Sequence, residues 1–220
     1  MVKITLVDAE SYSLSEFAFL GLWGRRYVVF DVESTGAEFS TDSITQIGAV
    51  AVYEEGPRDS ESFVRLVRPW KPIPEKIERL TGVTNEQVSV ASNFASIWTE
   101  FVAFCGDAVL VTQCGYEFDF PIIDAECDRL GLARLSGVRL DTKAVFALMH
   151  SDRSEIFSTN FLSDYYGVDR SLFKRHDALG DAMLISRIFH AQLQEARIRG
   201  LDGFIARSPI TIRRFVLPPI

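Results

Sequence analysis

Two carboxylates stand where a buried strand would carry only hydrophobic side chains. An apolar run from Tyr27 to Phe30 leads directly into Asp31 and Glu33. Because side chains on a strand alternate between its faces, Asp31 and Glu33 would point to the same side, within reach of one shared ion. A divalent cation would remove their mutual repulsion, and oxygen ligands favour Mg²⁺ or Mn²⁺ over zinc. Alternatively, the strand ends at Asp31 and both acids are solvated in a turn; this segment alone favours neither interpretation.

Two further acidic residues occupy positions where a simple surface role is unexpected. Asp119 lies between Phe118 and Phe120, directly after an expected strand and its turn. The alternative is structural: Asp119 would cap the following helix, with Pro121 in its first turn. Asp181 lies next to the apolar stripe of a late helix, so its side chain is expected to face the body of the protein.

A histidine precedes the last of these acids. His176 and Asp181 are five positions apart in the sequence, about 140° around an α-helix, so both cannot lie on one helical face. Asp177 is a suitable N-cap residue, which places His176 on the preceding loop, able to turn toward Asp181. A single histidine is more often a surface or core residue, so this one gains meaning only from the acids around it.

The secondary structure expected to position these residues changes along the chain from successive strands to alternating strands and helices. The run that ends at Asp31, then Ile44 to Tyr53 and Ser60 to Val67, predict three antiparallel strands joined by short turns. After residue 90, short strands at Ala108 to Thr112 and Val138 to Leu140 alternate with helices, which indicates parallel pairing. The expected helices span Pro74–Leu80, Ser92–Cys105, Phe118–Leu130, Thr142–His150, Thr159–Tyr166 and Ala178–Ile198. An α/β fold with helices on the faces of a mixed sheet follows.

The two ends of the chain are less informative. Met1 to Val7 is expected to form a short strand and Leu14 to Leu20 a short helix. Arg207 to Ile220, which contains several prolines, is expected to form an irregular tail or an arm that reaches a neighbour. We therefore expect an N-terminal extension at 1–24, one domain at 25–199 and a C-terminal tail at 200–220.

Composition narrows the class of protein. A chain of 220 residues with 47% hydrophobic content fits one globular domain. The apolar run from Phe17 to Trp23 is too short to span a bilayer and follows acidic residues, so we expect no membrane anchor and no secretion. Three cysteines without metal-ligand spacing favour reduced thiols and a cytoplasmic location. The net charge of -7 argues against coating of duplex DNA, although not against a nuclease with acidic metal ligands.

These acids and the histidine resemble, in order and spacing, the three exonuclease motifs of the DEDDh (DnaQ-like) 3′-5′ exonuclease family. The likeness spans roughly Arg26 to His190 and also includes Ile73 to Thr84, Asp141-Thr142 and Phe161 to Gly167. It implies the ribonuclease H-like fold, an α/β fold whose mixed five-stranded sheet has an antiparallel meander, then parallel strands, and helices on both faces. The middle motif departs from the family pattern, because Cys114 stands where an asparagine is usual. That change puts one polar contact near the substrate in doubt.

The resemblance implies a metal-dependent mechanism. Two divalent cations, Mg²⁺ or Mn²⁺, would lie about 3.5 to 4 Å apart, held by Asp31, Glu33, Asp119 and Asp181. One ion would supply hydroxide and the other would stabilise the leaving oxygen. His176 would take the proton from the attacking water, since imidazole suits a general base at neutral pH. The product would be a nucleoside 5′-monophosphate, released from the 3′ end of single-stranded or frayed DNA or RNA.

The resemblance also implies substrate contacts and partners. Main-chain groups around Ser34 and Thr35 are expected to meet the terminal nucleotide, and Leu80 with Thr81 to pack against its base or sugar. The family includes proofreading subunits of bacterial replicative polymerases, so a DNA polymerase or a second copy of the chain is a candidate partner. The alternative function is a catalytically weak nucleic-acid-binding module on the same fold, which would normally have lost one of the acids.

Overall fold

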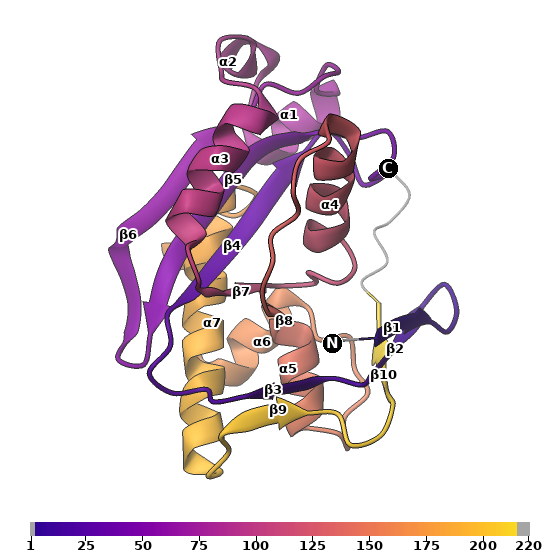
Figure 1. Cartoon of the computed structure of the whole chain (residues 1–220), viewed down its shortest axis with the longest axis vertical. Coiled ribbons are helices and arrows are strands. Elements are labelled where there is room, and N and C mark those ends of the chain that lie inside the picture. The colour runs from indigo at the N-terminus through magenta and orange to yellow at the C-terminus, as the bar shows by residue number, and fades with distance from the viewer. Residues whose placement is uncertain (1–2, 215–220) are drawn as a thin grey trace.

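A mixed five-stranded sheet runs through the middle of the computed structural model, which describes residues 3–214 (Figure 1). Its strand order is β6-β5-β4-β7-β8. The first three strands in the sequence pair antiparallel, and β7 and β8 continue the sheet in parallel. The strands are β4 (Tyr27–Ser34), β5 (Ile44–Tyr53), β6 (Gly56–Leu66), β7 (Val109–Thr112) and β8 (Arg139–Asp141). The predicted meander followed by parallel strands is confirmed.

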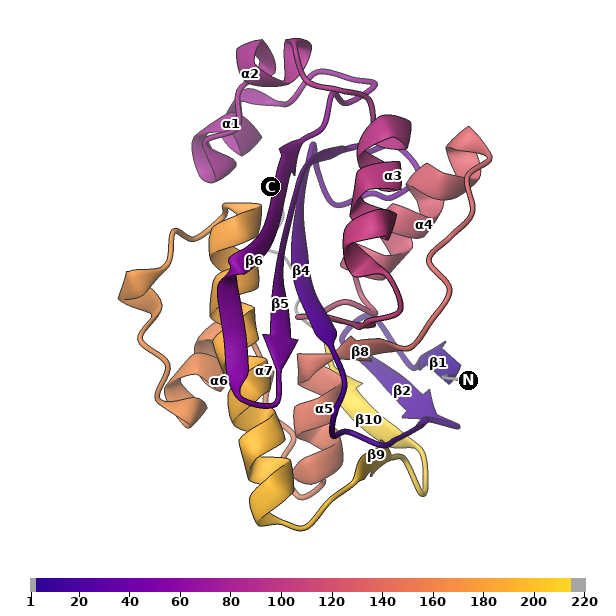
Figure 2. The same ribbon diagram turned by 60° about the vertical axis from the view of Figure 1, so that its left-hand side comes forward.

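Helices cover both faces of this sheet, as predicted (Figures 1 and 2). One face packs against α3 (Phe94–Cys105) and α4 (Asp119–Leu130). The other face packs against α5 (Thr142–Met149), α6 (Thr159–Tyr166) and α7 (Ala178–Ile198). Each helical layer encloses its own hydrophobic cluster, so the sheet separates two cores.

The alternation of side chains along β4 decides which layer its acids face. Phe30 packs edge-on against rings of α3 and α4 at centroid distances of 5.7 Å. Tyr27 packs instead against Phe189 of α7, at 5.0 Å. Because every second side chain lies on the same face, Asp31 and Glu33 share the face of Tyr27 and point toward the α7 layer.

Two short helices, α1 (Glu75–Thr81) and α2 (Asn85–Ser89), lie beyond the N-terminal end of α7 (Figure 2). The first follows Pro74 and ends at Gly82 in the left-handed conformation, which confirms the predicted short helix. Thr84 caps the second through a capping box.

The two ends of the chain pair with each other, which the sequence did not indicate. One small sheet has the order β1-β2-β10, and β3 pairs with β9 in another. These strands are β1 (Lys3–Leu6), β2 (Ser11–Ser15), β3 (Ala18–Leu20), β9 (Gly203–Ile205) and β10 (Ile210–Arg213). The strand expected within residues 1–7 is confirmed for β1. Residues 1–2 and 215–220 of the expected strand and tail lie outside the described part.

The expected helix over Leu14 to Leu20 is wrong, and so is the irregular tail where β10 forms. In β2 the buried Tyr12 and Leu14 alternate with serines, which is the period of a strand. The partner strands come from the opposite end of the chain, so local periodicity could not reveal them. Within residues 3–214, no helix has the combined length and apolar character needed to cross a lipid bilayer.

Candidate active site

Three of the four predicted carboxylates meet between β4 and α7. Ligand oxygens of Asp31, Glu33 and Asp181 all lie within 4.8 Å of one another. The first two come from the end of β4 and the third from the first turn of α7. The strand continues through Ser34, so the alternative in which it stops at Asp31 and both acids are solvated in a turn is wrong.

The first turn of α7 is fixed by two hydrogen bonds at its N-terminal end. The Asp177 side chain accepts the Gly180 N–H at 3.1 Å, which confirms Asp177 as the N-cap. On β5, Gln46 accepts the Ala178 N–H at 3.0 Å. Gln46 also lies opposite Glu33 in the pairing of β4 with β5. It therefore connects β4, which carries Asp31 and Glu33, to α7, which carries Asp181.

Asp119 lies beside this group but is bound to the strand. It is the first residue of α4 and only 3% exposed, and its Oδ1 accepts the Val32 N–H at 3.3 Å. The pairing of β4 with β7 ends at Val29, so Val32 lies beyond the reach of that ladder. The N-cap position of α4 is Phe118, so the alternative role of Asp119 as a helix cap is wrong.

The loop before Asp119 is held by Asp141, a buried acid. The sequence indicated this acid only as part of the resemblance to the family. The Asp141 carboxylate, at the end of β8, accepts the N–H groups of Cys114 and Tyr116 at 3.2 and 3.3 Å. Cys114 adopts a φ of 58°, an uncommon value for a residue with a side chain. Cys114 stands where the family usually has an asparagine. The shape of the loop at this position depends on backbone contacts, which a cysteine can also make.

His176 is attached to the group through its backbone. Its N–H donates to Asp181 Oδ2 at 2.7 Å, and its φ is 55°. The residue lies in the loop before α7, as predicted, and its side chain is exposed. This arrangement holds an imidazole next to an acid of the cluster without using the ring in the fold.

Sequence reasoning missed Arg175. Its Nη1 lies 2.8 Å from Asp181 Oδ1, and its charge partly offsets the rise that burial and neighbouring acids cause in the pKa of Asp31 and of Glu33. The guanidinium is therefore a positive charge within the cluster. Its position directly before His176 is the one feature of the sequence that could have suggested this role.

Burial raises the pKa of each clustered acid, and repulsion by the neighbouring acids adds to it at Asp31 and Glu33. Burial, with the charges of Asp181 and Asp119, raises the pKa of Glu33 to about 8. Burial raises the pKa of Asp119 to about 7. Burial and then Asp119 raise the pKa of Asp31 well above its usual range, and burial also raises that of Asp181 against the opposing charge of Arg175. An all-carboxylate group that resists ionisation in this way is suited to a hard divalent cation.

The donor atoms fit such a cation in their chemistry. Asp31, Glu33 and Asp181 offer carboxylate oxygens, and Mg²⁺ and Mn²⁺ prefer oxygen ligands. Asp181 Oδ1 also lies 2.8 Å from Arg175 Nη1, so one oxygen of this acid is already paired with a positive side chain.

The two residues predicted to meet the terminal nucleotide from β4 lie in a tightly bonded loop. Ser34 Oγ donates to the Gly36 carbonyl at 2.5 Å. Thr35 is 2% exposed; its N–H donates to the Ser43 carbonyl at 2.9 Å, and its hydroxyl donates to Asp42 at 2.8 Å. These groups are therefore occupied in shaping the loop, and a nucleotide would meet the surface that they shape.

On α1, Leu80 and Thr81 differ in availability. Leu80 is 52% exposed, whereas Thr81 is 3% exposed. The Thr81 hydroxyl donates to the Ile77 carbonyl and accepts the Val83 N–H, so it fixes the end of α1. Lys174 Nζ lies 3.8 Å from where a side chain on Gly82 would begin, which places this end of α1 beside the loop of His176. Of these two predicted residues, Leu80 is therefore the one whose side chain is available to a ligand.

The chain matches known exonucleases. A model of the exonuclease family RNase_T matches residues 28–189. DNA polymerase III PolC-type proteins of Staphylococcus epidermidis and Staphylococcus haemolyticus are 30% and 31% identical to it over 179 and 177 residues. These matches cover 81% and 80% of this chain but 12% of each polymerase, so the chain spans about an eighth of the length of these relatives.

Solved structures share the fold. The nuclease domain of 3′hExo, described as a DEDDh family member bound to rAMP, has a TM-score of 0.68 at 18% identity, covering 77% of this chain and 92% of that domain. Exonuclease I has a TM-score of 0.64 at 18% identity, covering 78% of this chain and 41% of its own. The chain therefore belongs to the RNase_T family of exonucleases and has the ribonuclease H-like fold of its DEDDh members.

Proposed function

We propose that this chain, through a domain at 25–199, is a metal-dependent 3′-5′ exonuclease that acts on single-stranded or frayed ends of DNA or RNA. The observation that carries the proposal is the convergence of Asp31, Glu33 and Asp181 from β4 and α7, with Asp119 bound beside them. Family membership supports nuclease chemistry at this group, because no other structural need explains several repelling acids in one place.

The four carboxylates are the proposed ligands of two divalent cations, Mg²⁺ or Mn²⁺. Bound ions of this kind supply a hydroxide at neutral pH and stabilise the oxygen that leaves the phosphate. The raised pKa values of Glu33 and Asp119 mean that these residues release protons when they take up a cation. Metal affinity is therefore expected to increase with pH.

His176 is the proposed general base. Its exposed ring is held next to Asp181 by the backbone N–H, so the imidazole can accept a proton from the attacking water without leaving the loop. Leu80 and the loop of Ser34 and Thr35 are the proposed contacts of the terminal nucleotide, and the buried Thr81 supports them by fixing α1. The product is a nucleoside 5′-monophosphate.

The relatives suggest where such an activity is used. The PolC-type relatives are DNA polymerases, so we propose proofreading of a polymerase as one setting, with the polymerase as a partner in the same or another chain. A homodimer is the alternative assembly. Sedimentation of the purified chain alone and with a replicative polymerase separates these two arrangements.

A non-catalytic nucleic-acid-binding module is the competing function. It would bind single strands without shortening them, and it would have no use for the full set of acids. The structure favours the enzyme because each of these acids is placed at the strand and helix ends where it can contribute to one centre.

The direct test of the proposed polarity uses single-stranded DNA and RNA labelled at either end. With Mn²⁺, a 5′ label should appear in a ladder of shortening products, whereas a 3′ label should be released at once as a mononucleotide. Asp107→Asn, which changes an exposed acid on a distant loop, is the matched control for Asp181→Asn. Immediate release of the 5′ label would reverse the proposed direction.

Salt dependence tests the preference for single strands. The net charge of -7, from 30 acidic and 23 basic residues, argues against a long basic surface that contacts many phosphates. About three contacts, each contributing about -0.7, give a slope of roughly -2 for log affinity against log salt. A much steeper slope together with equal rates on blunt duplex and single strand would show that the protein grips duplex DNA.

A further inference from the structure

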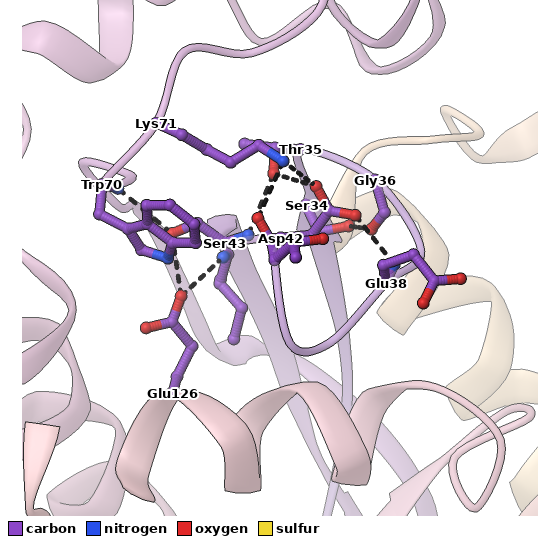
Figure 3. Close-up of polar contacts among 11 residues, drawn as sticks. Ser34, Thr35, Gly36, Glu38, Asp42, Ser43, Trp70, Lys71 and Glu126 are labelled. Carbon is purple, nitrogen blue, oxygen red and sulfur yellow. Dashed lines mark hydrogen bonds and ion pairs between the residues drawn. The ribbon is translucent and has the colours of Figure 1, made fainter. Parts of the chain in front are cut away.

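Asp42, a buried acid, connects the loop after β4 to the segment after β6 (Figure 3). Asp42 accepts hydrogen bonds from the Thr35 hydroxyl and the Glu38 N–H, each at 2.8 Å. It also accepts from Lys71 Nζ at 2.7 Å, and the same ammonium reaches the Thr41 carbonyl at 2.8 Å. The position of Lys71 and its neighbours is thus tied directly to the loop proposed to meet the terminal nucleotide.

The neighbour of Lys71 is an exposed tryptophan. Trp70 is 49% exposed, although its backbone is held: its N–H donates to Ser43 Oγ at 3.4 Å. Ser43 in turn donates to the buried Glu126 of α4 at 2.9 Å (Figure 3). The backbone of Trp70 is therefore held in place while about half of its side chain is open to solvent.

Two cations approach this ring. The Arg129 guanidinium lies 5.4 Å from the ring centroid and Lys71 Nζ lies 5.8 Å from it. Each cation is also paired with a buried carboxylate, Arg129 with Glu126 and Lys71 with Asp42. The positive groups are therefore held in place beside the ring, and their charges are largely balanced.

An exposed aromatic ring beside fixed cations has the chemistry that binds the bases of a single strand. A structural role for Trp70 would need only its backbone N–H, which any residue except proline supplies. The ring itself contacts Arg129 and Lys71 and still keeps an exposed part that a base can reach. The Trp70 N–H donates to Ser43, whose carbonyl accepts the Thr35 N–H, so the Trp70 backbone lies close to the loop proposed to meet the terminal nucleotide. Its ring lies beside Arg129 in the last turn of α4.

We propose that Trp70, with Arg129 and Lys71, is a stacking subsite for a base within the first few nucleotides of a single-stranded 3′ end. This inference rests on the proposed exonuclease function, because the subsite is proposed to hold the strand whose terminal nucleotide is removed at the carboxylate cluster. Stacking, rather than charge, supplies most of the binding there, because both cations are already paired. The subsite would retain a short single strand while its terminal nucleotide is removed.

Tryptophan fluorescence reports on the subsite directly. The chain has three tryptophans; Trp98 is buried, and Trp23 lies under the Arg197 guanidinium at 4.4 Å. In a His176→Ala background, which leaves the carboxylates intact, a single-stranded oligothymidylate should quench the emission. The quenching should persist in Trp23→Phe and disappear in Trp70→Phe. Persistent quenching in Trp70→Phe would overturn the proposal.

Binding and turnover separate the subsite from catalysis. Trp70→Ala should weaken oligonucleotide binding, measured by anisotropy of a labelled strand, on the order of 10-fold. Trp70→Phe should bind nearly as tightly as the parent, because it keeps an aromatic face. Tyr165→Ala, at a partly exposed aromatic on α6, is the matched control and should leave oligonucleotide binding unchanged. Unchanged binding in Trp70→Ala would overturn the subsite.

The same variants keep the two proposals distinguishable. In otherwise native protein, Trp70→Ala should raise KM for a single strand with little change in kcat, and should leave hydrolysis of a mononucleotide aryl ester unchanged. Loss of ester hydrolysis in Trp70→Ala would overturn the subsite, because it would place Trp70 in the catalytic centre. If native protein hydrolyses neither substrate, the proposed function fails, whereas the fluorescence and anisotropy results still decide whether Trp70 binds a strand.

Discussion

Gly48 of β5 lies directly opposite Asp31 of β4, and the backbone of α7 passes over it. A side-chain carbon on Gly48 would lie 2.2 Å from the carbonyl carbon of Ala178 and 2.2 Å from the Leu179 nitrogen. No real side chain fits in that space. The missing side chain is what allows the first turn of α7 to bring Asp181 to the acids of β4.

Gly48→Ala should therefore push the start of α7 away from the sheet. We expect it to lower the free energy of unfolding by about 1 to 3 kcal/mol, as overpacking does. It should also weaken Mn²⁺ binding, because Asp181 moves away from Asp31. Denaturant unfolding and titration calorimetry measure the two effects. Mn²⁺ affinity equal to that of the native protein would show that α7 is not positioned by this contact.

Asp31→Asn should abolish hydrolysis without harming the fold. Burial and neighbouring acids raise the pKa of Asp31 well above its usual range, so the neutral amide removes an unfavourable charge from the metal-free protein. Unfolding in the presence of a chelator should show equal or greater stability than the native protein. Asp107→Asn should retain full activity. A marked loss of metal-free stability in Asp31→Asn would contradict repulsion within the cluster.

The stability of the metal-free protein should depend on pH through the same acids. Burial raises the pKa of Glu33 from 4.5 to about 8 and that of Asp119 from 3.8 to about 7. At a pH between the unfolded and the folded pKa of each acid, the folded state binds more protons than the unfolded state. The contribution of these two acids to the free energy of unfolding is therefore complete below about pH 4 and is lost as pH rises toward 8. Chemical unfolding across this range, with Glu33→Gln for comparison, measures the slope. A slope just as steep in Glu33→Gln would exclude Glu33 as its source.

His176→Ala should separate proton transfer from metal binding. The backbone N–H bond to Asp181 remains in the variant, so the carboxylates keep their places. We expect turnover to fall about 10² to 10⁴-fold, as on loss of a general base, with Mn²⁺ affinity little changed. Single-turnover kinetics and calorimetry provide the two values. An equal loss of affinity and rate would make His176 a ligand or a structural residue instead.

Short-range patterns predicted most of the fold. The bounds of α6 and α7 are those that periodicity and caps indicated, and alternation along β4 correctly placed Asp31 and Glu33 on one face. Of the strands at the two ends, β1 was predicted, whereas β2, β3, β9 and β10 were missed because each of them pairs with a segment from the opposite end of the chain. Residues 14–20 also contain apolar side chains at helical spacing, and only the distant partner strands decide in favour of a sheet.

In the site, the sequence indicated residue types and could not indicate their three-dimensional contacts. Arg175 was missed because its ion pair with Asp181 depends on the left-handed turn at His176. Gly48 was missed because its role is visible only where a helix and a strand approach each other. The fastening of Lys71 to Asp42 likewise joins residues 29 positions apart. Such contacts arise from tertiary packing, which no local pattern encodes.

The central claim is that the four carboxylates form one metal-dependent hydrolytic centre. Its most direct test is the release of nucleoside 5′-monophosphate from a single-stranded oligonucleotide, followed by mass spectrometry over a Mn²⁺ titration, in native protein and in Asp119→Asn. Such a centre predicts release that requires Mn²⁺, stops with a chelator and is abolished in the variant. Release that continues in the chelator, or that is undiminished in Asp119→Asn, would contradict it.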